Sequence, residues 1–256
     1  MNKSSNLSSV ESALKILESF TIDQPEKRVT QIANDLDIGK SSVSRILKTL
    51  LNRGFVKKNT ETQKYSLGTK VLTLYSSLMS EMEVVKEAHP ILEELASQTK
   101  ESVQLAELEG SNVIYTEQIQ SSYPIQIFAH IGRINPIHCT SSGKVLLSYQ
   151  EIDIIENILN SELQAYTSAT ITDKNTLKKE LLEVRSSGYS YIENEFVDGI
   201  VSIAAPIRDY NEKVVAAVSL VGPIQRINGS KSKIYINKVI EAARKISLNM
   251  GYSFDR

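Results

Sequence analysis

Residues 28–67 constrain the fold more than any other segment of this chain, because their pattern predicts two short helices followed by a small β-hairpin. The first helix spans residues 30–36, with Thr30 as its expected N-cap. Its apolar residues share one face at helical spacing: Ile32, Ala33 and Leu36. A tight turn follows, in which Gly39 is expected to take a positive φ, a conformation that glycine tolerates. Helices and a hairpin in this order indicate a winged helix-turn-helix.

Residues 40–50 are predicted to form the second helix of this unit, about three turns long. Its apolar stripe consists of Val43, Ile46, Leu47 and Leu50. The opposite face carries short hydroxyls and cations: Lys40, Ser41, Ser42, Ser44, Arg45 and Lys48. Such a face meets bases and phosphates when a recognition helix enters a DNA groove. We expect Arg45 to read bases and most of its neighbours on this face to hold phosphates.

The hairpin is predicted from alternating residues on both sides of a polar turn at 60–63. Its cations are Lys57, Lys58 and Lys64. Residues 1–68 hold 11 Lys and Arg against 7 Asp and Glu, a net charge of +4, so the other 188 residues carry −5. A basic N-terminal part on an acidic remainder favours contact with DNA phosphates. The alternative interpretation is a protein-interaction module whose serine-rich helix face is only solvated.

Further helices are expected on both sides of this unit. One begins at Ser8 or Ser9, and its core-facing residues are predicted to be Val10, Ala13, Leu14, Leu17 and Phe20. Residues 69–82 and 84–99 also have helical patterns. The helix at 69–82 is apolar around most of its circumference, through Val71, Leu72, Leu74, Tyr75, Leu78 and Met79. We expect it to pack against another subunit, with cover of its own domain as the alternative.

From about residue 101 the pattern changes to short strands separated by helices. Strands are predicted at 103–108, 112–118, 125–128, 190–193, 202–207 and 214–220. Helices are predicted at 142–147, 151–159, 174–186 and 231–249. Two blocks of strands around helices indicate an antiparallel α+β sheet. The chain thus divides into a DNA-binding domain at 1–68, a linker helix at 69–84 and a second domain at 85–256.

Composition excludes several other classes of protein. No apolar run approaches the ~20 residues that span a bilayer, and the N-terminus lacks an apolar signal segment, so we expect a cytoplasmic protein without membrane contact. The single Cys139 rules out an internal disulfide. A zinc site at His130, His138 and Cys139 is less favoured than a pocket or core position for these residues, so neither a metal nor a cofactor is predicted.

Catalytic motifs are also incomplete. Two Gly-Lys pairs suggest a phosphate loop, but Asn34 and His138 stand where that loop needs its first glycine. A hydrolase could be composed from Ser141, His138 and Glu193, yet the sequence has no Gly-x-Ser-x-Gly elbow. We therefore expect a protein that is not an enzyme.

Two blocks of residues resemble the IclR-type bacterial transcriptional regulators, over roughly residues 7–251. The N-terminal block comprises residues 13–17, 39–47, 53–56 and 65–68. The second comprises residues 136–147, 170–172, 188–189 and 203–207, with Glu195 and Gly199. The resemblance implies a winged helix-turn-helix, a linker helix and a GAF-like effector domain with an antiparallel sheet and flanking helices. It also implies dimers or tetramers on double-stranded operator DNA.

The resemblance further implies that a small effector, usually an organic or aromatic acid, binds in a cup of the second domain. Carried over by position, its contacts are Ile127, Asn135, Ser141, Ser142, Gly143, Ser202 and Ser219, with Glu193 and Glu195 at the rim. Free N–H groups at the helix start near Ser141 suit a carboxylate. We expect a repressor controlled by such an acid, and the alternative is a ligand-sensing adaptor that acts through protein contacts without DNA.

Overall fold

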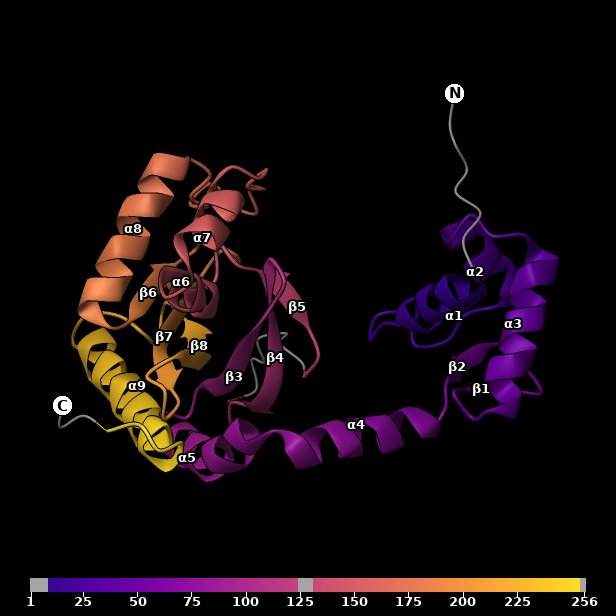
Figure 1. The fold of residues 1–256 in the computed structure, drawn as a ribbon, viewed down its shortest axis with the longest axis horizontal. Helices are drawn as coiled ribbons and strands as arrows, with labels where there is room; N and C mark the ends of the chain where they lie inside the picture. The colour runs from indigo at the N-terminus through magenta and orange to yellow at the C-terminus, as the bar shows by residue number, and fades with distance from the viewer. Residues whose placement is uncertain (1–8, 124–130, 254–256) are drawn as a thin grey trace. The chain divides into compact units, whose positions relative to one another are not determined.

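The computed structural model describes residues 9–123 and 131–253, and the chain forms two compact units, Met1–Glu81 and Met82–Arg256 (Figure 1). The first unit contains four helices and one hairpin in its described part: α1 (Ser9–Glu18), α2 (Val29–Asp35), α3 (Lys40–Asn52), β1 (Val56–Lys58), β2 (Tyr65–Leu67) and α4 (Lys70–Glu81). The antiparallel hairpin pairs Val56 with Leu67, and an isolated bridge joins Lys27 to Tyr65. This arrangement confirms the predicted winged helix-turn-helix.

A small apolar core holds the first unit together. Its buried members come from α1, α2, α3 and the hairpin: Ile16, Phe20, Ile32, Val43, Leu47, Val56 and Tyr65. The Lys27 ammonium donates to Asp35 Oδ2 at 2.8 Å and ties the segment before α2 to the end of that helix. Burial of one stripe from each helix leaves the polar face of α3 in solvent.

Two local predictions in the helix-turn-helix are wrong. Helix α2 begins at Val29 with Arg28 as its N-cap, so Thr30 lies inside the helix and caps nothing. Gly39 has φ −55°, and Asp37 carries the positive φ, 51°. The left-handed residue directly follows Leu36, the C-cap of α2, and aspartate is among the residues that tolerate this conformation. Gly39 is left to act as the N-cap of α3.

The predicted core face of α1 is also partly wrong. Val10 and Leu14 are 70% and 54% exposed, whereas Ser12 and Ile16 are buried. Ser12 and Ile16 are one turn apart, so the buried face of the helix is rotated from the predicted face.

Helix α4 has no buried residue in the described chain, and Leu72, Leu74, Tyr75 and Leu78 are all exposed.

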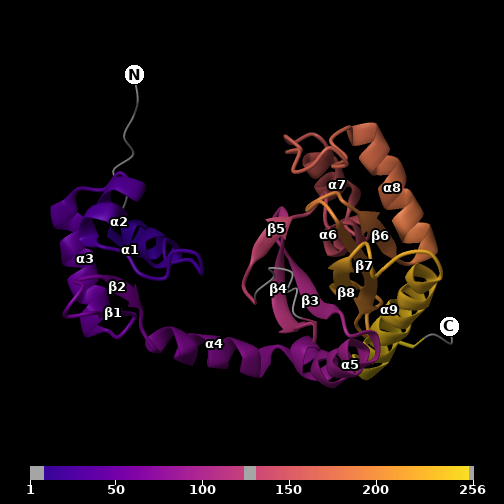
Figure 2. The ribbon, with the colours of Figure 1, turned by 180° about the vertical axis from the view of Figure 1, so that it is seen from behind.

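The second unit is an antiparallel α+β fold, as predicted. Its elements are α5 (Glu83–Thr99), β3 (Ser102–Glu109), β4 (Asn112–Ile119), β5 (Ile134–Pro136), α6 (Ser141–Ser148), α7 (Ile152–Leu159), α8 (Lys174–Ser187), β6 (Ser190–Glu193), β7 (Ile200–Arg208), β8 (Val214–Pro223) and α9 (Ser230–Asn249). The strand order is β5-β4-β3-β8-β7-β6, with antiparallel neighbours throughout (Figure 2). The strand predicted at 125–128, and with it Ile127, lies outside the described residues.

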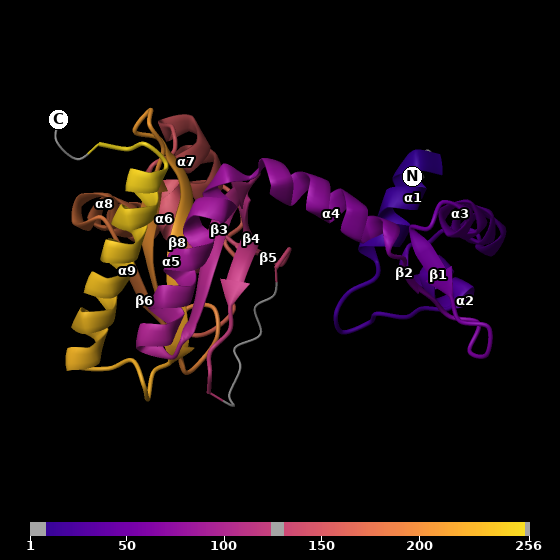
Figure 3. The same ribbon diagram turned by 90° about the horizontal axis from the view of Figure 1, so that it is seen from below.

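Helices cover both faces of this sheet. Helices α5 and α9 lie side by side on one face (Figure 3), where Tyr235 Oη donates to the Thr99 carbonyl. The opposite face packs against α6, α7 and α8 through a core that includes Ala106, Val145 and Leu181. Alternation along each strand therefore decides which side chains point toward α6.

Candidate nucleic-acid interface and ligand site

The solvent face of α3 carries the polar side chains predicted to contact DNA. Lys40, Ser41, Ser44, Arg45 and Lys48 are exposed and Ser42 is half-buried. Because Val43 and Leu47 are buried, the helix is fixed in rotation and its hydroxyls and cations face outward. Arg45 also borders a groove of about 230 Å³ between α1 and α3, beside Ala13 and Ile46.

The start of α3 is suited to an anion. Its N-cap, Gly39, has no side chain to accept a hydrogen bond from the first turn. The N–H groups of that turn have no acceptor within the helix, and the helix dipole adds a partial positive charge there. A DNA phosphate at this position would be held by backbone donors as well as by the Lys40 ammonium.

The hairpin presents a second group of cations. Lys57 and Lys58 are exposed and Lys64 is half-buried. The turn between the strands is ordered by Asn59, whose Oδ1 accepts hydrogen bonds from the N–H groups of Glu61 and Thr62. The hairpin is thus a preformed basic loop in the same unit as α3.

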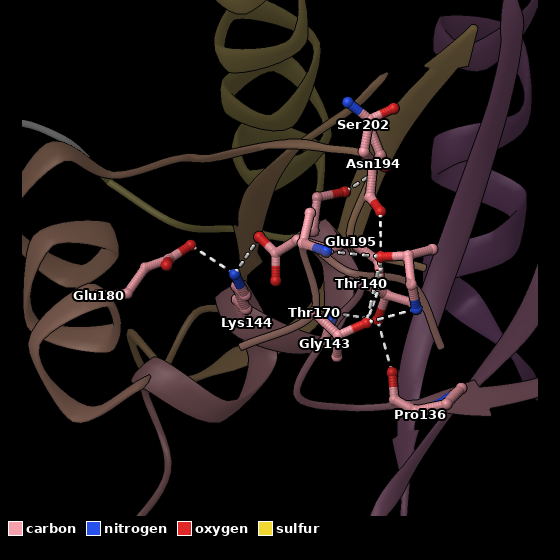
Figure 4. A network of polar contacts seen from close by, with 12 residues as sticks. Pro136, Thr140, Gly143, Lys144, Thr170, Glu180, Asn194, Glu195 and Ser202 are labelled. Atoms are coloured by element: carbon pink, nitrogen blue, oxygen red, sulfur yellow. Dashed lines mark hydrogen bonds and ion pairs between the residues drawn. The ribbon is translucent and has the colours of Figure 1, made fainter. Parts of the chain in front are cut away.

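In the second unit, the start of α6 is held against the loop before it. Thr140 Oγ1 accepts the N–H of Gly143 at 3.2 Å and donates to the Pro136 carbonyl at 2.8 Å (Figure 4). A Cβ at Gly143 would lie 2.1 Å from the Ile137 carbonyl oxygen, so only glycine fits this contact. The backbone of residues 137–143 therefore fixes where the first turn of α6 lies.

Four serines, called here the serine cluster, lie at this helix start: Ser141, Ser142 and Ser219 are buried, and Ser202 is half-buried. The hydroxyls of Ser141 and Ser202 are hydrogen-bonded at 2.5 Å. The hydroxyl of Ser219 has no hydrogen-bond partner among the described residues. Because burying an unpaired hydroxyl costs about 1–3 kcal/mol, the Ser219 hydroxyl calls for a partner that a bound molecule can supply.

The structure adds two residues that the sequence did not single out. Tyr115, buried beneath α6, has a raised pKa because burial disfavours the phenolate, and the side chains of Asn135 and Ser142 oppose that rise. Gln104 is buried and lies directly across from Ser219 in the sheet. Neither had a sequence signal of its own, since only the strand pairing brings them to the serine cluster.

The two predicted rim glutamates have other partners. Glu195 Oε1 accepts from the Lys144 ammonium at 2.5 Å, and Lys144, with no exposed side-chain surface, also donates to Glu180 Oε1 at 2.5 Å (Figure 4). Burial raises the pKa of Glu195, and Lys144 opposes the rise. Glu193 is exposed and accepts from the Tyr191 hydroxyl. Among the other predicted contacts, Ser141 and Ser202 are hydrogen-bonded to each other, and Tyr115 lies within reach of both Asn135 and Ser142.

The side chains considered for zinc or hydrolysis have separate roles. His138 Nε2 lies 3.0 Å from the Gln164 carbonyl, and burial lowers the pKa of its imidazole. Burial also raises the pKa of the Cys139 thiol to about 12. Across residues 9–123 and 131–253, no group of three His, Cys, Asp or Glu is placed to hold a metal ion.

None of the described helices has the length and apolarity that crossing a bilayer requires.

A winged helix-turn-helix followed by a separate sheet domain defines a helix-turn-helix transcriptional regulator. Residues 9–60 match the family model described as IclR helix-turn-helix domain, and residues 76–248 match Bacterial transcriptional regulator IclR C-terminal. The chain belongs to the IclR family of bacterial transcriptional regulators.

Individual relatives agree with this assignment. The chain is 32% identical over 248 residues to the HTH-type transcriptional regulator KdgR of Escherichia coli (strain K12), covering 96% of this chain and 94% of KdgR. It is 30% identical over 241 residues to the Transcriptional repressor IclR of the same organism, covering 93% and 88%. The crystal structure of an IclR homolog complexed with 4-hydroxybenzoate from Microbacterium hydrocarbonoxydans superposes with a TM-score of 0.85 at 25% identity, covering 95% and 99%. These relatives are regulators and not enzymes.

Proposed function

We propose that this protein is a repressor that binds operator DNA through α3 and the basic hairpin and is controlled by a small organic acid bound at the serine cluster. The observation that carries the proposal is the exposed face of α3, where Arg45 and Lys48 follow an N-terminus without a side-chain cap. Arg45 supplies a bidentate donor for a guanine edge, a contact worth about 1–3 kcal/mol of discrimination. Lys57, Lys58 and Lys64 would neutralise phosphates on the same duplex.

The ligand half of the proposal rests on the second unit. The unpaired hydroxyl of Ser219 lies on β8, which packs against α6, and the N–H groups at the start of that helix favour a carboxylate. A relative was crystallised with 4-hydroxybenzoate, an acid that also carries a hydroxyl. A repressor role is supported by the relative named Transcriptional repressor IclR.

Self-association would supply the second DNA-binding unit. The exposed apolar side chains of α4 give this chain a surface that another copy can cover. A two-fold dimer places two α3 helices in successive major grooves of a partly palindromic operator. The acid can change DNA affinity only if it binds more tightly to one arrangement of the two α3 helices than to another. The coupling free energy between two such sites is typically about 1–3 kcal/mol.

The direct test is fluorescence anisotropy of the purified protein with DNA from upstream of its own gene and neighbouring genes, in excess nonspecific competitor and across a salt titration. Competitor-resistant binding with a steep salt slope is the expected result. Binding no tighter than to competitor DNA, by folded protein with and without candidate acids, would contradict it. That second outcome would favour the adaptor that acts through protein contacts.

A further inference from the structure

Strand β6 forms one edge of the six-stranded sheet and pairs only with β7 among the described strands. The Asn194 N–H, just after β6, donates to the Ile200 carbonyl of β7. Because the direction of backbone groups alternates along an antiparallel strand, those of Ile192 also face β7, whereas those of Tyr191 and Glu193 face away from the sheet. No described residue bonds to these outward N–H and C=O groups. The outer side of β6 is therefore a free strand edge.

A groove of about 610 Å³ lies along this free edge, between β6 and α8, which are neighbours in the fold (Figure 1). Its lining includes Tyr191 and Ile192, two successive residues of β6. Successive side chains of a strand point to opposite faces of the sheet. Because side chains from both faces line the groove, it opens along the edge of β6 and not on one face alone.

The groove is acidic. Four carboxylates line it, and no lysine or arginine of the described chain does: Glu180, Glu183, Glu193 and Glu195. The buried Lys144 compensates for one of these charges and is shared by Glu180 and Glu195. Glu183 and Glu193 are exposed, and neither forms an ion pair with a described residue. A net negative charge thus remains beside the outward backbone groups of β6.

An extended peptide suits both features of this surface. Its backbone can add a strand to a free edge, and its alternate side chains can enter the groove beside that edge. Lysine or arginine at those alternate positions complements the carboxylates, and the rings of Tyr189 and Tyr191 offer aromatic surface to the same cations. DNA phosphates would be repelled, and β6 of a second copy would bring like carboxylates together.

We propose that the free edge of β6 is a docking site for an extended basic segment of a partner protein. The segment adds one strand to the sheet and places its lysine or arginine side chains against Glu183 and Glu193. None of the residues of the serine cluster lines this groove, so the docking site does not depend on the proposed control by an acid.

The test is fluorescence anisotropy of the full-length protein with a labelled peptide of about eight residues that alternates lysine and threonine, since threonine favours extended backbone. One comparison peptide has glutamate in place of lysine, and the other keeps the lysines but has every backbone N–H methylated. The lysine peptide is expected to bind saturably and at least about tenfold tighter than both. The absence of saturable binding overturns the proposal. Equal binding of the methylated peptide also overturns it, because attraction between charges would then act without strand pairing.

A pair of double variants locates the site. Glu183→Lys combined with Glu193→Lys reverses the two exposed charges of the groove and is expected to weaken the lysine peptide at least about tenfold. The control combines Glu109→Lys with Glu162→Lys, which are exposed, lie outside the groove and change the net charge equally. The control should bind the peptide nearly as well as the wild type. All four positions are exposed, so thermal unfolding should remain close to that of the wild type, and equal losses of affinity in the two double variants overturn the proposal.

Discussion

The Lys144 ammonium lies 2.5 Å from a carboxylate oxygen of Glu195, and the lysine has no exposed side-chain surface. Glu180 provides a second carboxylate at the same distance. The ion pair joins α6, whose first turn carries Ser141 and Ser142, to the segment after β6. Lys144 therefore has a structural role that the Gly-Lys sequence does not reveal.

Replacing Lys144 with Met should destabilise the protein by about 3–5 kcal/mol near neutral pH, because it leaves Glu195 buried without its cation. Urea unfolding measures the loss. The control is Lys178→Met, which removes the exposed Lys178–Glu156 pair and should cost at most about 1 kcal/mol. Similar losses for the two variants would contradict the account of Lys144.

The loss caused by Lys144→Met should also depend on pH. The pKa of Glu195 is raised by burial, so its protonated form favours folding, and this contribution is lost as pH rises through the folded pKa. Lys144 opposes that rise, and without it the pKa of Glu195 rises further. The stability difference between wild type and variant should therefore be smaller at pH 5 than at pH 8, and equal differences would count against this explanation.

Gly143→Ala should destabilise the second unit by about 1–3 kcal/mol, because the new methyl would lie 2.1 Å from the Ile137 carbonyl oxygen and the backbone must shift. Ligand affinity should fall too, since the first turn of α6 would move. Gly39→Ala is a suitable control: its φ is −55° and no atom lies within 4 Å of the added carbon, so a loss within about 1 kcal/mol is expected in thermal unfolding. Equal losses at the two glycines would be inconsistent with the contact at Ile137.

Leu74→Glu should produce a monomeric protein with weakened DNA binding, because a charge would be placed on the apolar surface of α4 that we propose another copy covers. Leu74 is 54% exposed, so misfolding is not expected from this change. Light scattering coupled to size exclusion gives the mass, and Ser76→Glu on the same helix is the control. An oligomer that survives Leu74→Glu unchanged would argue against the role of α4.

The helix-turn-helix could be predicted closely from the sequence because its signals are local. Val43, Ile46, Leu47 and Leu50 recur at helical spacing, and the structure places α3 at Lys40–Asn52. The errors are local as well. Either Asp37 or Gly39 could supply the positive φ of the tight turn, and which of them does so depends on where α2 ends. Val10 and Leu14 were assigned to the core because apolarity alone does not show which face of a helix is covered.

The ligand site could be predicted only in part, because it is built by contacts between distant segments. Gln104 and Ser219 meet only because β3 pairs with β8, a neighbour relation that no sequence periodicity specifies. Glu195 was expected at the rim, yet its partner Lys144 is 51 residues away in the sequence. A resemblance identifies the serine cluster by position, whereas the pairing of Gln104 with Ser219 becomes visible only in the sheet register.

The basic hairpin and the recognition helix should respond differently to substitution. Lys58→Ala should weaken binding to every duplex alike and reduce the slope of log K against log salt by about 1, because Lys58 is assigned to a phosphate. The measurement is a salt titration of binding to the operator and to a scrambled duplex. A change in the ratio of those two affinities would contradict this assignment.

The most direct test of the central claim, that α3 reads DNA sequence, is the ratio of affinities for the operator and a scrambled duplex, measured side by side for wild type and Arg45→Ala. If Arg45 reads a base, the ratio should fall by about fivefold or more, in line with the loss of about 1–3 kcal/mol of discrimination. An unchanged ratio in the folded variant would contradict base reading by Arg45 and return α3 to the role of a phosphate-binding helix.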